Sequence, residues 1–155
     1  MDNDYFMRKA IALAVENVKN GGGPFGAVIV RDDEIVATGV NRVTANNDPT
    51  AHAEVSAIRA ACSKLGTFNL SGCVIYTSCE PCPMCLGAIY WAHIDKIYYG
   101  ANKDDAASAN FDDSFIYKEL AVPKSKRRVA IEELLPEEAQ AAFDAWRANN
   151  SRVEY

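Results

Sequence analysis

The sequence predicts a single α/β domain in which a mixed sheet lies between helices. The chain has 155 residues, which suits one compact domain spanning residues 1–155. Its composition, 49% hydrophobic and 24% charged, is ordinary for a globular protein. Segments with helical periodicity alternate with short apolar segments of strand type, without repeats or low-complexity stretches.

The first elements are predicted to be one helix and two strands. Residues 4–19 place apolar side chains at helical spacing, and Asp2 or Asp4 can cap this helix. A glycine-rich segment then ends the helix. Residues 27–30 and 35–40 are apolar, and a short acidic turn between them favours two neighbouring strands.

A second helix is predicted between residues 47 and 66. Asp48 is a candidate N-cap, Pro49 suits the first helical position, and Gly66 suits the C-terminal stop. This helix would carry His52 close to its start.

The alternation continues through the second half of the chain. Residues 73–77 form a predicted strand, a helix is predicted within residues 83–93, and residues 96–100 form a further strand. Strand–helix–strand spacing of this kind implies a right-handed parallel crossover. A last helix is predicted within residues 136–150, where alanine and aromatic side chains share one face.

Charge and cysteine content restrict the partners and the compartment. The net charge of −5 gives no general attraction to nucleic acid or to an anionic membrane, so we expect neither as a partner. The basic stretch at 124–128, KSKRR, is typical of a solvated loop, with RNA contact as the alternative. No secretory apolar region opens the chain and the five cysteines are an odd number, so we expect a cytoplasmic protein with reduced thiols.

The sequence TSCEPCPMC, at 77–85, concentrates three of the cysteines between a predicted strand and a predicted helix. Reduced thiols argue against a structural disulfide and leave a redox pair, a structural zinc site or a catalytic metal site. Cys82 and Cys85 form a Cys-x-x-Cys pair, which supplies two thiolates from one turn. Cys79 is an alternative to either thiolate.

A histidine completes the predicted metal site. His52 and Glu54 form a His-x-Glu motif, whereas His93 lies at the far end of the predicted helix, roughly 12 Å along its axis from Cys85. Three ligands without a reachable fourth side chain indicate a catalytic zinc that keeps an open position for water. We therefore expect one zinc ion per chain, bound by His52, Cys82 and Cys85.

Glu54 is the predicted catalytic residue. Residues two apart do not share a helix face, so His52 and Glu54 converge on a metal only if it lies off the helix N-terminus. Glu54 would then carry protons and would not be a ligand. A purely structural site has no use for such a group, which argues against a non-catalytic, zinc-stabilised binding module.

These motifs resemble the signature of zinc nucleobase deaminases, and the sequence resembles the cytidine and deoxycytidylate deaminase-like superfamily. Within it, four segments are similar to bacterial guanine deaminases, and the resemblance covers nearly the whole chain. The segments are DPTAHAEVSAIRAA, YTSCEPCPMCLGAIYWA, FDDSFIYKE and the terminal EY.

The resemblance implies a three-layer α/β/α fold with a five-stranded mixed sheet flanked by helices. It implies a homodimer in which the C-terminal segment, about residues 135–155, is swapped between subunits. The implied reaction is zinc-dependent hydrolysis of guanine, a purine, to xanthine and ammonia. The alternatives within the superfamily are deamination of guanosine, or of adenosine or cytosine in transfer RNA.

Recognition of a base requires a flat slot and polar groups that match its edge. Asn41, after the second predicted strand, can both donate and accept a hydrogen bond, although it also suits a turn. Phe25 and Trp91 could wall the slot, although buried aromatic side chains usually belong to the core.

Two acidic residues and the last residue complete the predicted substrate contacts. Asp112 and Asp113 can accept hydrogen bonds from guanine N–H groups, with an N-cap for a short helix at 114–120 as the alternative. The resemblance favours Asp113 of the two. It also implies that Tyr155 closes the pocket, that of the partner subunit in a swapped dimer.

Overall fold

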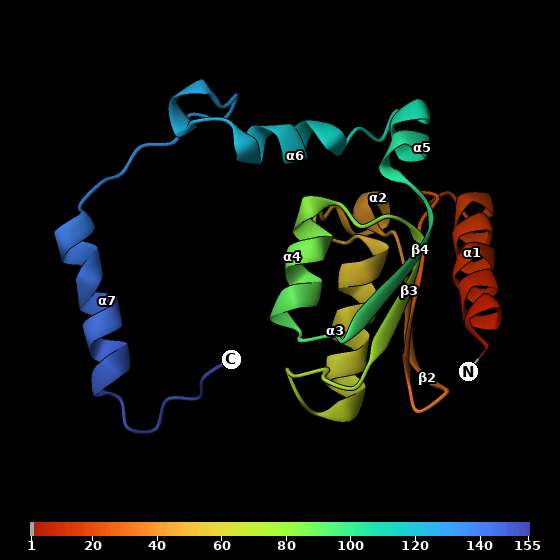
Figure 1. The fold of residues 1–155 in the computed structure, drawn as a ribbon, viewed down its shortest axis with the longest axis horizontal. Coiled ribbons are helices and arrows are strands. Elements are labelled where there is room, and N and C mark those ends of the chain that lie inside the picture. Colours follow the sequence, from red (N-terminus) through yellow and green to blue (C-terminus); the bar gives the residue numbers. More distant parts are fainter. Residues whose placement is uncertain (1) are drawn as a thin grey trace. The chain divides into compact units, whose positions relative to one another are not determined.

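The computed structural model describes residues 2–155 and separates into two compact units, Met1–Ile116 and Tyr117–Tyr155 (Figure 1). Within the first unit the elements are, in order, α1 (Asn3–Lys19), β1 (Gly26–Arg31), β2 (Glu34–Val40), α2 (Val43–Asn46), α3 (Ala53–Leu65), β3 (Val74–Cys79), α4 (Pro83–Trp91), β4 (Lys96–Ala101) and α5 (Lys103–Ser108). Helix α6 (Ser114–Ala121) crosses the boundary between the units. The second unit continues with the 3₁₀ helix η1 (Lys124–Lys126) and α7 (Pro136–Ala148).

One mixed sheet organises the first unit, in the order β2-β1-β3-β4. Strand β1 pairs antiparallel with both β2 and β3, and β3 pairs parallel with β4. The predicted mixed sheet and the parallel β3–α4–β4 arrangement are therefore confirmed. The expected fifth strand is wrong, because residues 2–155 contain four strands.

Hydrogen bonds after β4 start a helix. The Asn102 side chain accepts a hydrogen bond from the backbone N–H of Asp105, and the Asp105 carboxylate accepts one from the backbone N–H of Asn102, both at 2.9 Å. This capping box starts α5 one residue after β4 ends. The next regular element, α6, is also helical.

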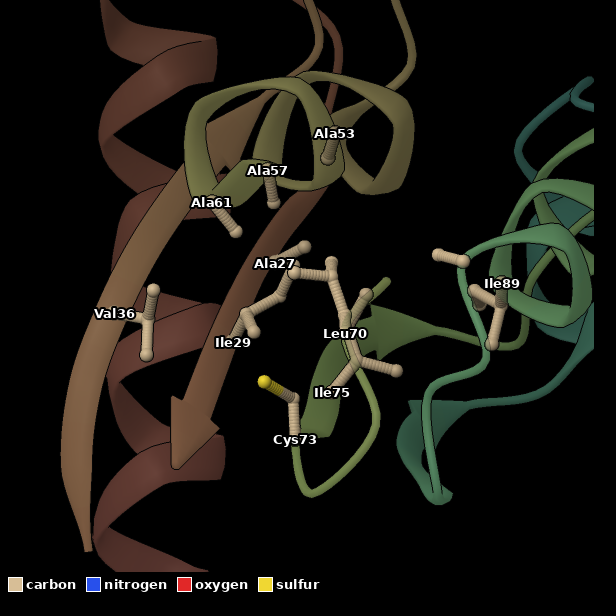
Figure 2. Close-up of a cluster of buried hydrophobic side chains, with 11 residues drawn as sticks. Ala27, Ile29, Val36, Ala53, Ala57, Ala61, Leu70, Cys73, Ile75 and Ile89 are labelled. Atoms are coloured by element: carbon tan, nitrogen blue, oxygen red, sulfur yellow. The ribbon is translucent and has the colours of Figure 1, made fainter. Parts of the chain in front are cut away.

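Each face of the sheet buries alternate residues of β1, as the period of a strand requires. Val28 and Val30 pack with Phe6 of α1 on one face, and Ala27 and Ile29 belong to a second cluster on the other. Figure 1 shows α1 on the first face and α3 and α4 on the second. Figure 2 shows the second cluster, where the side chains of α3 point towards those of the strands. The first unit thus has helices on both faces of the sheet.

Small residues bring α3 very close to β2. Ala53, Ala57 and Ala61 recur every four residues on the buried face of α3. A Cβ atom on Gly39 would collide with the Ala53 carbonyl oxygen and lie 2.5 Å from the Ala57 amide nitrogen. The lack of a side chain at Gly39 therefore fixes the height of α3, and of its N-terminal residues, above the sheet.

The predicted helix ends are confirmed at Asp2 and Gly66 and wrong at Asp48 and Pro49, since α3 begins at Ala53. The Asp2 carboxylate caps α1 by accepting a hydrogen bond from the Tyr5 amide at 3.0 Å. Gly66 ends α3 in the left-handed conformation, with φ of 65°. Asp48 does not cap α3, because its carboxylate is occupied by the amide and hydroxyl of Thr50 at 2.8 and 2.6 Å. The N-cap of α3 is His52.

None of the helices within residues 2–155 is both long enough and apolar enough to span a bilayer.

Replacing Gly39 should loosen α3. Because overpacking against backbone atoms forces the chain to shift, Gly39→Ala should lower the free energy of unfolding by about 1–3 kcal/mol. Gly87→Ala is the matched control, since a Cβ there meets nothing within 4 Å and alanine favours the helix by about 1 kcal/mol. Urea denaturation of both variants measures the difference. Equal stability of Gly39→Ala and the wild type would contradict the proposed contact.

Candidate active site

Three ligand atoms meet at the N-terminal ends of α3 and α4. The candidate donors of His52, Cys82 and Cys85 all lie within 4.8 Å of one another. His52 Nδ1 lies 3.5 Å from the Cys82 sulfur and 3.4 Å from the Cys85 sulfur. In tetrahedral zinc, with Zn–S of about 2.3 Å and Zn–N of about 2.0–2.1 Å, the N···S separation is about 3.5 Å. The three side chains therefore fit zinc in both chemistry and spacing.

Helix capping puts these donors in place. His52 is the N-cap of α3 and Cys82 is the N-cap of α4, both with extended backbone. Pro83 occupies the first position of α4, and the Cys85 amide donates to the Cys82 sulfur at 3.5 Å. The donors thus lie off two helix N-termini, whose partial positive charge stabilises thiolates. This is the geometry that allows His52 and Glu54 to converge.

Hydrogen bonds among the three donors shift the pKa of each of them. The hydrogen bond from the Cys85 thiol lowers the pKa of Cys82 to about 4, with a further contribution from His52 and opposition from burial. The same hydrogen bond raises the pKa of Cys85. The hydrogen bond to Cys82 raises the pKa of His52. Zinc binding would therefore displace protons from this cluster.

Glu54 is a buried acid beside the donors. It is the second residue of α3, and only 7% of its surface is exposed. Burial is the main cause that raises the pKa of its carboxyl group. A carboxyl group whose pKa is raised towards neutrality can both accept and release a proton, as a proton carrier requires.

A cavity of about 660 Å³ opens onto Glu54, His52 and Cys82. The cavity forms where β2, β3 and β4 end and β1 begins. These four strand ends lie at the same end of the sheet, because β1 runs opposite to the other three strands. The predicted substrate residues that line it are Phe25, Asn41, Asp112 and Asp113.

Polar groups in the cavity are arranged so that a donor and an acceptor remain for a ligand. Asn41 Oδ1 accepts a hydrogen bond from the Val43 amide at 3.2 Å, which directs the Asn41 amide nitrogen elsewhere. Asp113 Oδ1 is buried without a hydrogen-bond partner among residues 2–155. Burial is the first cause that raises the pKa of Asp113, followed among the raising causes by the nearby Cys82. Asp112 instead accepts a hydrogen bond from the Ser114 hydroxyl at the start of α6.

Residues 1–101 match the family described as the cytidine and deoxycytidylate deaminase zinc-binding region. The chain belongs to this deaminase family. The cluster of His52, Cys82 and Cys85 lies within the matched residues and is the candidate zinc site of this deaminase.

Relatives of this deaminase include proteins with different stated substrates. The chain is 53% identical to guanine deaminase of Bacillus subtilis over 100% of both chains. It is 41% identical to a tRNA-specific adenosine deaminase of Aquifex aeolicus over 65% of this chain and 67% of that protein.

The chain is also similar to solved structures of guanine deaminases. The guanine deaminase structure from Bacillus subtilis matches with a TM-score of 0.97 and 53% identity, covering 100% of this chain and 99% of the other. The guanine deaminase structure from Nitrosomonas europaea matches with a TM-score of 0.68 and 33% identity, covering 72% of this chain and 65% of the other.

Four other residues named in the sequence analysis lie outside the cluster of His52, Cys82 and Cys85. Trp91 ends α4, is 66% exposed and does not line this cavity, so its position gives no support to a role in walling it. Tyr155 belongs to the second unit, and its role stays a prediction. His93 follows α4 and is outside the cluster. Cys79 ends β3 and lines the cavity, but burial raises the pKa of its thiol to about 11.

Phe111 and Glu80 are among the residues of the deaminase cavity that sequence reasoning missed. Phe111 contacts Phe25 edge-on, with ring centroids 5.0 Å apart, and its position before two aspartates was the available signal. Glu80 lies between Cys79 and Cys82 in the segment of residues 79–85, called the metal loop below. Its carboxylate accepts a hydrogen bond from the Lys103 amide at 3.1 Å. That bond ties the metal loop to the start of α5.

Zinc content distinguishes the two candidate thiolates at the start of the metal loop. Cys79→Ala should retain one zinc per chain, because the Cys79 sulfur is outside the cluster and its thiol stays protonated. Cys82→Ala should lose most of its zinc, because it removes one of three ligands. Elemental analysis of the purified variants measures both. Loss of zinc from Cys79→Ala with retention in Cys82→Ala would reverse the assignment.

Proposed function

We propose that this deaminase hydrolyses guanine to xanthine and ammonia. The observation that carries the proposal is one cavity that joins a zinc site, the buried acid Glu54 and the unpartnered carboxylate oxygen of Asp113. The reaction belongs to purine metabolism. Five free cysteines support a reducing compartment, which we take to be the cytoplasm.

Similarity along the whole chain supports guanine over a tRNA adenosine. The family match ends at residue 101, before Asp113. The similarity to the Bacillus subtilis guanine deaminase extends over all of this chain, including the position of Asp113, whereas that to the tRNA-specific adenosine deaminase of Aquifex aeolicus extends over 65% of it. The basic stretch 124–128 is also partly structural, because Arg127 donates to the carbonyl oxygens of Glu119 and Leu120 at 3.0 and 3.5 Å.

The polar groups of the cavity complement the edges of guanine. Guanine carries N–H donors at N1 and N2 and acceptors at O6, N3 and N7. Asp113 would accept from an N–H group, and a carboxylate makes the stronger, charge-assisted bond. The amide nitrogen of Asn41 would donate to an acceptor, while Phe25 and Phe111, which pack edge to face against each other, would form one apolar wall beside the base. Adenine lacks a ring N1–H group and leaves Asp113 less well paired.

Zinc bound by His52, Cys82 and Cys85 supplies Lewis acidity that makes water a nucleophile near neutral pH. Glu54 accepts a proton from the attacking water while a bond forms between the water oxygen and C2 of guanine. The protonated carboxyl group then gives that proton to N3 of the ring. Glu54 next takes the remaining proton from the new hydroxyl group on C2 and passes it to the exocyclic amino group. The bond between C2 and this amino nitrogen breaks, ammonia leaves and the ring retains the oxygen as the C2 carbonyl of xanthine. One water is consumed for each ammonia released.

We also propose a homodimer in which the segment of about residues 135–155 packs over the partner's cavity. Helix α7 supports this proposal, because none of its residues is buried. Its aromatic side chains Phe143 and Trp146 are 56% and 39% exposed. In the proposed dimer, Tyr155 closes the pocket over the base and leaves little room for a ribose.

Glu54→Gln tests the proton-carrying step. The amide cannot take a proton from water, so kcat should fall by about 10²–10⁴. Zinc content and melting temperature should stay close to the wild type, because Glu54 is not a ligand. Turnover near the wild-type rate with full zinc occupancy would exclude this role.

A comparison of kcat/KM for guanine, guanosine, adenine and cytosine tests the substrate. Guanine should be preferred over guanosine by about tenfold or more, which corresponds to about 1.4 kcal/mol. Ammonia release by the purified protein measures each value. A tenfold preference for guanosine would replace guanine deamination with guanosine deamination, whereas no release from any base would favour a binding module.

Mixed dimers test whether the C-terminal segment acts on the partner. A chain lacking residues 151–155 and a Glu54→Gln chain should each be nearly inactive. In a mixed dimer the truncated chain keeps Glu54 and receives the partner's tail, so about one active site per dimer should return. Differently tagged chains allow the mixed dimer to be isolated and assayed. Absence of activity in isolated mixed dimers would mean that the tail closes the site of its own chain.

A further inference from the structure

The side-chain amide of Asn17 joins two separate walls of the cavity. Asn17 lies near the end of α1, outside the lining of the cavity itself. Its amide nitrogen donates to the Gly23 carbonyl at 2.8 Å and to the Asn41 carbonyl at 2.9 Å. One NH₂ group therefore uses both of its hydrogens to hold the glycine turn after α1 and the end of β2.

These two bonds close a ring around the residues proposed to contact the base. The Phe25 amide donates to the Gly23 carbonyl at 2.9 Å, and the Asn41 amide donates to the Phe25 carbonyl at 3.2 Å. Asn17 then links the Asn41 carbonyl back to that of Gly23. The closed ring passes through Gly23, Phe25 and Asn41, and the amide of Asn17 is its one side-chain member.

The glycine turn is shaped around the two amides. A Cβ atom on Gly22 would lie 2.8 Å from Cγ of Asn17, and a Cβ atom on Gly23 would lie 3.1 Å from Cγ of Asn41. The Gly22 amide also donates to the Asn17 carbonyl at 2.8 Å. Side chains at these positions would displace the amides, so the turn keeps Asn17 and Asn41 in fixed places.

Capping of α1 does not require the side chain of Asn17. The helix ends at Lys19, and the backbone N–H of its C-cap residue Asn20 donates to the carbonyl oxygens of Glu16 and Asn17. The Asn17 amide is directed instead at carbonyl groups outside the helix. Its contacts therefore serve the cavity wall.

We propose that Asn17 is a positioning residue that sets the affinity for the base by fixing Asn41 and Phe25. The inference rests on the proposed function for the contacts of those two residues. The Val43 amide holds Asn41 Oδ1, and Asn17 holds the backbone from which this side chain projects. With both ends held, the Asn41 amide nitrogen is oriented before the base arrives, which lowers the entropy lost on binding.

Asn17→Asp removes both donors while keeping the shape of the side chain, and it places an acceptor beside two carbonyl oxygens. We expect KM to rise by about tenfold or more while kcat changes by less than about threefold, since misplaced hydrogen bonds cost binding by roughly this amount. Asn20→Asp is the matched control: it makes the same charge change three residues away at the same helix end. It should leave KM, kcat and zinc content unchanged, because none of the side-chain hydrogen bonds found among residues 2–155 involves Asn20.

A double-mutant cycle separates positioning from a general loss of structure. In the Asn41→Ala background, Asn17→Asp should raise KM by less than about threefold, because its main target is already absent. If the rise in KM of the double variant equals the product of the rises in the two single variants, Asn17 acts independently of Asn41 and the proposal is overturned.

Asn17→Ala serves as the second variant, because it removes the donors without adding a charge. It should reproduce the rise in KM with zinc content unchanged. A KM within twofold of the wild type in a folded Asn17 variant would refute positioning. Loss of zinc or of folding in both Asn17 variants, with Asn20→Asp intact, would assign Asn17 a purely structural role and also refute it. All variants are assayed on the best base of the wild type, so a preference for a base other than guanine overturns the proposed function without deciding the role of Asn17.

Discussion

His52 and Cys82 reach one metal because α3 and α4 begin at the same edge of the sheet. Strands β2 and β3 flank β1 and both run antiparallel to it, so their carboxyl ends lie at the same end of the sheet, and each leads towards one of the two helices. Strand β4 is parallel to β3 and ends at the same edge, from which the chain continues to Asp113. Donors, acid and cavity walls that are far apart in the sequence meet here because of strand direction alone.

The chemistry at this edge is costly to bury, and the fold offsets that cost locally. Two thiol groups, an imidazole and the Glu54 carboxyl group lie within a few residues of two helix N-termini, where the peptide dipoles favour negative charge. The close contact of α3 with Gly39 holds one of these termini against the sheet. Burial of Glu54 raises its pKa because that helix end is fixed where water has little access.

The substrate side of the cavity follows a different design, in which hydrogen bonds are left incomplete. Asp113 keeps one buried oxygen unpaired, while Asn41 has its oxygen occupied and its backbone held in a ring of hydrogen bonds. An unpaired buried acceptor is unfavourable in the free protein and is satisfied when a donor binds. In the proposed reaction, selectivity for a base with N–H groups would arise from the same unpaired oxygen of Asp113.

The sequence by itself determined the metal chemistry, because the residue types and their short spacing within Cys82-x-x-Cys85 and His52-x-Glu54 limit what these side chains can do. It also determined most helices and strands, since periodicity and end signals such as Asp2 and Gly66 act locally. It did not determine that α3 begins at Ala53 with His52 as its N-cap, because Asp48 and Pro49 offer a local start signal four residues earlier. Only the tertiary structure decided which polar groups of the cavity remain free, and that Asn17 supports Asn41 across 24 residues of sequence. Hydrogen-bond partners that are distant in the chain are set by strand pairing and helix packing, which no local pattern specifies.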